Sequence, residues 1–183
     1  MKSMKKLILS IFVLSVVAII NNACFEDLND TSYDGPLVAE FSHLSNTEDE
    51  ADWISTGSFW ATTLSGEYDE APLQVSLVGP HQGEDKEVGY YIADEVYRDN
   101  DDNKLKLNEP DHDEWELLET TAEEGTDYDI QDDGIITIPA NSSYGPISME
   151  LTPTEERVMY IVLEERDIKP SENYKIFRLT IQP

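Results

Sequence analysis

Apolar residues that alternate with polar ones constrain the fold of this 183-residue chain more than any other feature. Successive side chains of a strand point to opposite faces, so a period of two predicts strands with one buried and one polar face. The alternation occurs in six segments: 37–41, 73–77, 88–92, 135–138, 147–151 and 176–181. No long helical stripe accompanies them. We therefore expect an all-β protein.

One segment is apolar at every position. Residues Val158 to Leu163 read Val-Met-Tyr-Ile-Val-Leu, which is typical of a central strand covered on both faces. Turn signals such as Asp133-Gly134 and Gly145-Pro146 separate the predicted strands. About seven or eight strands at this spacing predict one antiparallel β-sandwich over residues 36–183.

Two stretches do not follow this rhythm. Residues 48–68 hold Trp53, Phe59 and Trp60 among Ser, Thr and Gly, and we expect an extra hairpin there. Residues 94–116 are rich in acidic side chains, and we expect a long surface loop.

The first 23 residues have the layout of a secretory signal peptide. Lysines occur within residues 2–6, an apolar run covers residues 7–20, and Cys24 follows the cleavage point. Cys24 is the only cysteine, so it has no disulfide partner in its own chain and would serve as the acceptor for lipid. The layout resembles a bacterial lipoprotein signal, although Asn21 replaces the usual aliphatic residue. The alternatives are an ordinary signal peptide with an incidental cysteine and an uncleaved anchor.

An acidic cluster follows Cys24 directly. Glu26 and Asp27 resemble the surface-export signal of lipoproteins from the Bacteroidetes, and residues 24–35 read as a short acidic tether. The resemblance implies a lipid-anchored protein of the outer membrane, exposed at the cell surface. Its first partner would then be outer-membrane lipid, contacted through acylated Cys24.

The charge of the chain excludes one class of partner. There are 39 acidic and 12 basic residues, which gives a formal net charge of −27. Such a field repels phosphate backbones, so we expect no nucleic-acid partner. It also repels anionic lipid, so acyl chains rather than the protein surface would hold the chain at a membrane.

The C-terminal half resembles a known family. Residues 122–128 (Ala-Glu-Glu-Gly-Thr-Asp-Tyr) lead through Asp133-Gly134 to residues 136–142, with Asn141 where glycine is usual. This order resembles the Calx-beta-like, immunoglobulin-type domains of Bacteroidetes surface lipoproteins, a family of unknown function. The resemblance implies an immunoglobulin-like sandwich. Within the motif, Asp127 would accept hydrogen bonds from nearby backbone donors; the alternative is a metal or ligand role.

Calcium is a candidate ligand of the acidic loops. An Asp-x-Asp-x-Asn pattern places oxygen ligands at a spacing that suits this ion: Asp99, Asp101 and Asn103. The pattern then departs from a calcium loop, because Lys104 replaces the turn glycine and Pro110 takes the place of the final glutamate. A second set is implied by the calcium-binding acidic loops of Calx-beta domains in other settings: Asp85, Asp127 and Asp133. We expect no dedicated cofactor beyond this candidate.

Aromatic side chains offer a candidate surface for sugars. Tyr91 and Trp115 are the predicted ligand-binding residues, and Trp53 and Trp60 are further candidates, because flat rings stack on sugar rings. The alternative is that the tryptophans fill the sandwich core. The parity of Tyr91 places it on the face opposite Tyr90 and the core.

Catalysis has little support in the sequence. The three histidines are scattered, and neither a zinc-like spacing nor a Gly-x-Ser-x-Gly elbow occurs. We therefore expect a non-catalytic surface lipoprotein, accessory to polysaccharide or nutrient binding and to outer-membrane uptake proteins. The alternative is a structural or adhesive module that acts by protein–protein contact, which calcium could influence.

Overall fold

The computed structural model describes residues 35–42, 59–65, 68, 71–100, 104–111 and 114–183, and the backbone of residues 54–55. The chain divides into two compact units, Met1–Gly35 and Pro36–Pro183, and almost all of the described residues belong to the second unit. The predicted signal peptide and tether, with Cys24, Glu26 and Asp27, lie outside the described residues. Within those residues, no helix has the length and apolarity needed to cross a membrane.

The described residues contain fifteen β-strands and no helix, which confirms the predicted all-β class. Their bounds are β1 (Val38–Ser42), β2 (Ile54–Ser55), β3 (Trp60–Leu64), β4 (Gln74–Val78), β5 (Lys86–Ala93), β6 (Glu95–Asp99), β7 (Lys104–Lys106), β8 (Trp115–Glu119), β9 (Tyr128–Ile130), β10 (Ile135–Ile138), β11 (Tyr144–Pro146), β12 (Met149–Leu151), β13 (Arg157–Glu164), β14 (Lys169–Pro170) and β15 (Ile176–Ile181). The number exceeds the seven or eight expected, because several strands have only two or three residues.

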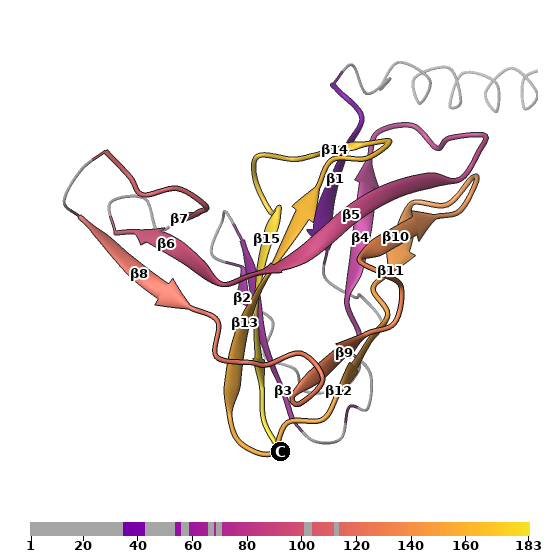
Figure 1. Cartoon of the computed structure of the whole chain (residues 1–183). Coiled ribbons are helices and arrows are strands. Elements are labelled where there is room, and N and C mark those ends of the chain that lie inside the picture. The colour runs from indigo at the N-terminus through magenta and orange to yellow at the C-terminus, as the bar shows by residue number, and fades with distance from the viewer. Residues whose placement is uncertain are drawn as a thin grey trace, which may run out of the picture. The chain divides into compact units, whose positions relative to one another are not determined.

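Two sheets enclose the main core. We call the four-stranded sheet β11-β4-β1-β14 sheet A and the six-stranded sheet β10-β5-β13-β15-β3-β2 sheet B (Figure 1). The alternating apolar residues of both sheets form one buried cluster, in which the rings of Phe41 and Phe177 lie 5.3 Å apart. Most neighbours are antiparallel, but β1 pairs with β14 and β15 pairs with β3 in parallel. The architecture is a β-sandwich.

The all-apolar strand has the covered position predicted for it. β13 lies between β5 and β15 in sheet B. Met159 and Ile161 belong to the main core, whereas Tyr160 and Val162 belong to a second buried cluster on the opposite face. Because both faces are covered, both sets of side chains are apolar.

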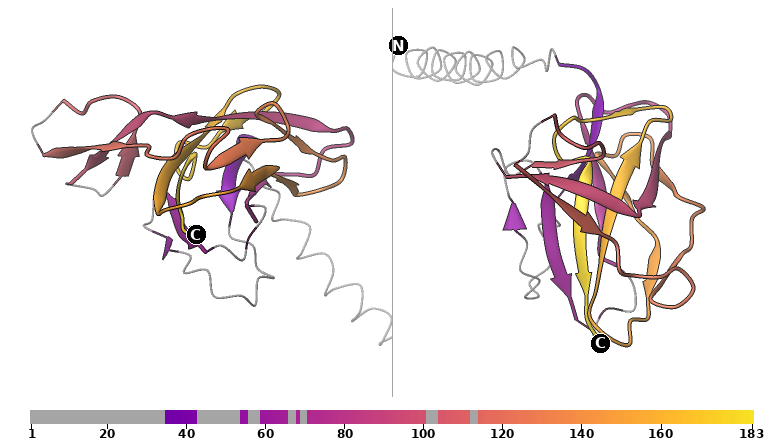
Figure 2. Two further views of the ribbon diagram at one scale, coloured as in Figure 1. Left: turned by 60° about the horizontal axis from the view of Figure 1, so that its bottom comes forward. Right: turned by 60° about the vertical axis from the view of Figure 1, so that its left-hand side comes forward.

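The acidic segment 94–116 is not the surface loop expected. It forms most of a separate three-stranded sheet, β7-β6-β8, which we call the finger sheet. Figure 1 places these strands at the left of the domain, and the left view of Figure 2 shows them continuing the line of β5. Val96 is fully buried in the second cluster. The prediction was wrong because the many acidic side chains of this segment obscure the alternation of β6 in the sequence.

The second cluster joins the finger sheet to sheet B. Its members from the finger sheet are Val96 and Leu105, with Leu107 and Leu118 packed against them. The members from sheet B line its outer face: Ala61, Ala93, Tyr160, Val162 and Ile176. The base of the finger sheet therefore rests on the face of sheet B that sheet A leaves uncovered.

Hydrogen bonds also fix the base of the finger sheet. Thr120 follows β8, and its backbone N–H donates to the carbonyl of Asp94 at 2.8 Å. The N–H of Thr121 donates to the carbonyl of Val158 at 2.8 Å, and the Thr121 hydroxyl accepts from the N–H of Val158 at 2.9 Å. The two ends of the finger sheet are thus held to each other and to β13.

The hairpin expected within residues 48–68 is present. β2 pairs with β3 in antiparallel orientation, with Ile54 opposite Ala61 and Ser55 opposite Trp60. The half-buried Trp60 packs against the main core, and the centroid of its ring lies 5.7 Å from that of Tyr174. This supports the core interpretation for Trp60, whereas Trp53 lies outside the described residues.

Candidate functional site

The finger sheet has one apolar face and one solvent face. Residues directly opposite each other in an antiparallel pair share a face. Asp99 lies opposite both Trp115 and Lys104, and Tyr97 lies opposite both Leu117 and Lys106. Since Val96 and Leu105 are on the buried face, the opposite face, which we call the solvent face, carries six side chains: Tyr97, Asp99, Lys104, Lys106, Trp115 and Leu117. Lys104 and Leu117 are exposed, Asp99 is buried, and the other three are half-buried.

Three of these side chains form an apolar platform. The rings of Tyr97 and Trp115 meet edge to face, with centroids 5.1 Å apart and planes at 76°. Leu117, which is 41% exposed, lies beside them on β8. Edge-to-face contact holds the two rings in a fixed relation, so the platform is preorganised.

A buried ion pair lies within the same face. Asp99 is only 2% exposed although its side chain is charged. Lys106 Nζ donates to Asp99 Oδ2, while the Lys106 side chain keeps 40% of its surface in solvent. The ammonium therefore neutralises a buried carboxylate.

The predicted calcium set is only partly described. Asp99 is a buried partner of an ammonium group, whereas Asp101 and Asn103 lie outside the described residues. The second set is dispersed: Asp85 accepts from the N–H of Ala140, and Asp127 contacts Arg157 at 3.2 Å. In the part of the chain that the structure describes, no three His, Cys, Asp or Glu residues are grouped to hold a metal. Calcium binding stays a prediction.

The Gly-Thr-Asp-Tyr motif has the structural role expected of it. Gly125 has φ of +76°, and Asp127 is fully buried. Asp127 Oδ2 accepts from the N–H of Glu123 at 2.9 Å. Asn141, which replaces the usual glycine, has φ of +61°, a conformation that asparagine adopts more readily than most residues. The motif closes turns, as the structural interpretation predicts.

A cavity of about 450 Å³ opens beside β7. Its walls come from residues 104–111 on one side and from Glu172 and Lys175 on the other. Lys104 and Lys106 thus belong both to the solvent face of the finger sheet and to this cavity. The three platform residues do not line the cavity, so Lys104 and Lys106 are the residues that connect the two.

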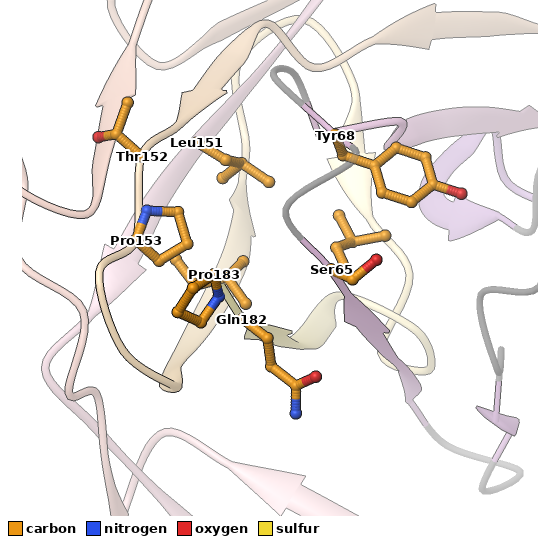
Figure 3. A pocket seen from close by; sticks show the side chains of 9 residues that line it. Ser65, Tyr68, Leu151, Thr152, Pro153, Gln182 and Pro183 are labelled. Carbon is orange, nitrogen blue, oxygen red and sulfur yellow. The ribbon is translucent and has the colours of Figure 1, made fainter.

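A second cavity of about 300 Å³ lies where β3, β12 and β15 end. Ser65 and Tyr68 line one side, and Thr152 and Pro153 line the other (Figure 3). Its lining side chains carry no formal charge, and it shares no residue with the finger sheet. It therefore forms no part of the candidate site.

The two predicted aromatic residues are on different sheets. Tyr91 lies on the outer face of sheet B, opposite Val162, and is 40% exposed, which confirms its predicted parity. Burial raises the pKa of its hydroxyl, and the charge of Glu164 adds to this effect. Trp115 is brought together instead with Tyr97 and Leu117, which were not among the predicted site residues. The alternation within 95–99 and 115–119 is the signal that would have found them.

The solved structures that are similar to this chain include the following two. One is the apo form of the Calx CBD1 domain, with 17% identity, a TM-score of 0.41, and coverage of 67% of this chain and 88% of that one. The other is CBD12 from CALX1.2, with 16% identity, a TM-score of 0.42, and coverage of 66% and 40%. Both TM-scores are below 0.5, so the assignment of a β-sandwich rests on the strands of this chain. No protein-family model and no curated protein matches the sequence.

Proposed function

We propose that this chain is a non-catalytic, lipid-anchored protein of the cell surface that binds polysaccharide through the solvent face of the finger sheet. The observation that carries the proposal is the platform of Tyr97, Trp115 and Leu117, three neighbouring apolar side chains on a solvent face. Binding there would make the protein an accessory to outer-membrane uptake proteins.

The shape of the platform fits an extended ligand. Aromatic side chains bury large apolar areas and stack on the C–H faces of sugar rings, while nearby polar groups hydrogen-bond to the hydroxyls. The lysines Lys104 and Lys106 supply such groups on the neighbouring strand. Because a sheet surface is open at both ends, it suits an internal stretch of a polymer rather than a chain end.

The proposed location at the cell surface rests on the sequence of the first unit of the chain. Acylated Cys24 would anchor the protein, and Glu26 with Asp27 would direct it to the outer leaflet. Replacing both acidic residues by alanine should leave acylation intact and protect the protein from externally added protease. Equal cleavage of parent and variant would contradict the export role.

Affinity gel electrophoresis with a panel of polysaccharides tests the binding proposal. The parent should be retarded by at least one polysaccharide, and Trp115→Ala should weaken the retardation about tenfold or more, in line with the value of an aromatic anchor. Tyr144→Ala is the matched control, since Tyr144 is 54% exposed on β11 of sheet A. No retardation by any polysaccharide, together with a cross-linked protein partner, would instead favour the adhesive alternative.

A further inference from the structure

We infer that the polysaccharide bound by this surface is carboxylated, as a uronate polymer is, and that its carboxylates bind at the cavity beside β7. The inference rests on the proposed function and specifies its ligand class. It is carried by the placement of lysines around that cavity.

Basic residues are scarce in this chain and yet gather at one cavity. Three of the twelve basic residues precede Cys24, which leaves nine for the rest of the chain. Three of those nine line this single cavity, Lys104 and Lys106 from β7 and Lys175 from the segment before β15. Lys106 and Lys175 pair with Asp99 and Glu172, so a ligand carboxylate would bind through the remaining N–H donors of these ammonium groups.

The cavity already holds a carboxylate of the protein itself. Glu172 Oε2 lies 3.0 Å from Lys175 Nζ, and Glu172 Oε1 lies 3.6 Å from Lys169 Nζ. The Glu172 side chain is 74% exposed, so it is easily displaced. Lys175 lowers the pKa of Glu172 through this hydrogen bond, and Lys169 adds a weaker effect. Glu172 shows where a ligand carboxylate would bind, and it would compete with that ligand.

The ion pair of Lys175 leaves capacity for a ligand. An ammonium group has three donors, so Lys175 can hold a ligand oxygen beside Glu172. Glu109 and Asp111 also line the cavity and would accept hydrogen bonds from sugar hydroxyls. Charges of the protein beyond about 8 Å are screened at physiological salt, so the charges that act on a ligand are the three lysines of the cavity and its three carboxylates, Glu172, Glu109 and Asp111.

Lys104 and Lys106 connect the aromatic platform to the cavity. Trp115 lies opposite Asp99, and Asp99 lies opposite Lys104 on the other side. A polymer stacked on the platform would therefore pass over Asp99 to reach the lysines of β7. Pro110 also lines the cavity and would contact its C–H groups.

The test uses the full chain in detergent, with polygalacturonate as the acidic probe and dextran as the neutral one. Lys175→Gln should weaken retardation by polygalacturonate about two- to fivefold, the range of a partly exposed ion pair. Glu172→Gln should strengthen it by a similar factor, because the competing carboxylate is gone. Lys86→Gln is the matched control, since Lys86 pairs with Glu84 away from the cavity.

The outcomes separate this inference from the proposed function. Two results would overturn the carboxylate inference and leave polysaccharide binding in place. One is retardation by dextran alone, and the other is polygalacturonate binding that changes neither in Lys175→Gln nor in Glu172→Gln. No retardation by either probe or by any other polysaccharide overturns the proposed function itself. Retardation by heparin but not by polygalacturonate would replace the carboxylate by a sulfate and so also refute the inference. Unchanged melting temperatures check that the variants fold.

Discussion

Truncation of Val96 should destabilise the whole domain, although Val96 lies in the projecting sheet. Val96 is fully buried between the finger sheet and sheet B. Val96→Ala removes two methyl groups, which contribute about 0.8 kcal/mol each, and leaves a small cavity. We expect the free energy of unfolding to fall by about 2 kcal/mol. For a domain of this size that corresponds to a melting temperature lower by about 4–8 °C.

Calorimetry and hydrogen exchange together test this reasoning. Leu117→Ala is the control, because Leu117 is on the solvent face of the same sheet, and it should cost about 0.5 kcal/mol or less. If Val96→Ala lowers the melting temperature no more than Leu117→Ala, the second core does not belong to the cooperative unit. Loss of exchange protection confined to residues 94–119 would then show that the finger sheet opens by itself.

Three further predictions concern packing, pH and the anchor. Gly145→Ala should lower the free energy of unfolding by about 2 kcal/mol, because the added Cβ would lie 2.6 Å from the Thr137 carbonyl oxygen. The control is Gly83→Ala, whose Cβ meets no atom within 4 Å and which should leave urea unfolding unchanged. Burial, reinforced by a 2.7 Å hydrogen bond to Asp132, raises the pKa of Tyr90. The folded state therefore keeps a proton that the unfolded state loses above about pH 10, so the free energy of unfolding should fall as the pH rises from there. The fall should be less steep in Tyr90→Phe, and equal slopes of stability against pH in parent and variant would refute the assignment. Cys24→Ala should release the protein from the detergent phase, and unchanged partitioning would show that Cys24 is not the anchor.

The longer strands of the sandwich could be predicted because each has its own local signal, whereas the prediction of a turn at Gly145-Pro146 was wrong, since these residues pair with β4 as part of β11. In 73–77 and 147–151 the apolar parity of the sequence matches the buried positions in the structure. The all-apolar run 158–163 also indicated that something covers both of its faces. What the sequence did not show is that its second cover is the acidic segment 94–116, since that pairing depends on tertiary contact.

The candidate site was predictable only in part for the same reason. Trp115 was selected for its chemistry alone, but its partner Tyr97 is eighteen residues away and meets it only through the register of β6 and β8. The cavity depends on a still longer connection, between β7 and the segment around Glu172. Local periodicity carries no information about which strands become neighbours.

The two parallel pairings have a consequence for how the domain forms. β1 pairs in parallel with β14, and β3 pairs in parallel with β15, so a strand near the start of each sheet's sequence pairs with one near the end of the chain. Contacts of such long sequence separation close large loops and slow folding. During synthesis, an emerging chain would present the edges of β1 and β3 without these partners until residues 169–181 arrive. The high acidic charge would then protect the incomplete chain, because like-charged chains repel each other before their strand edges can associate.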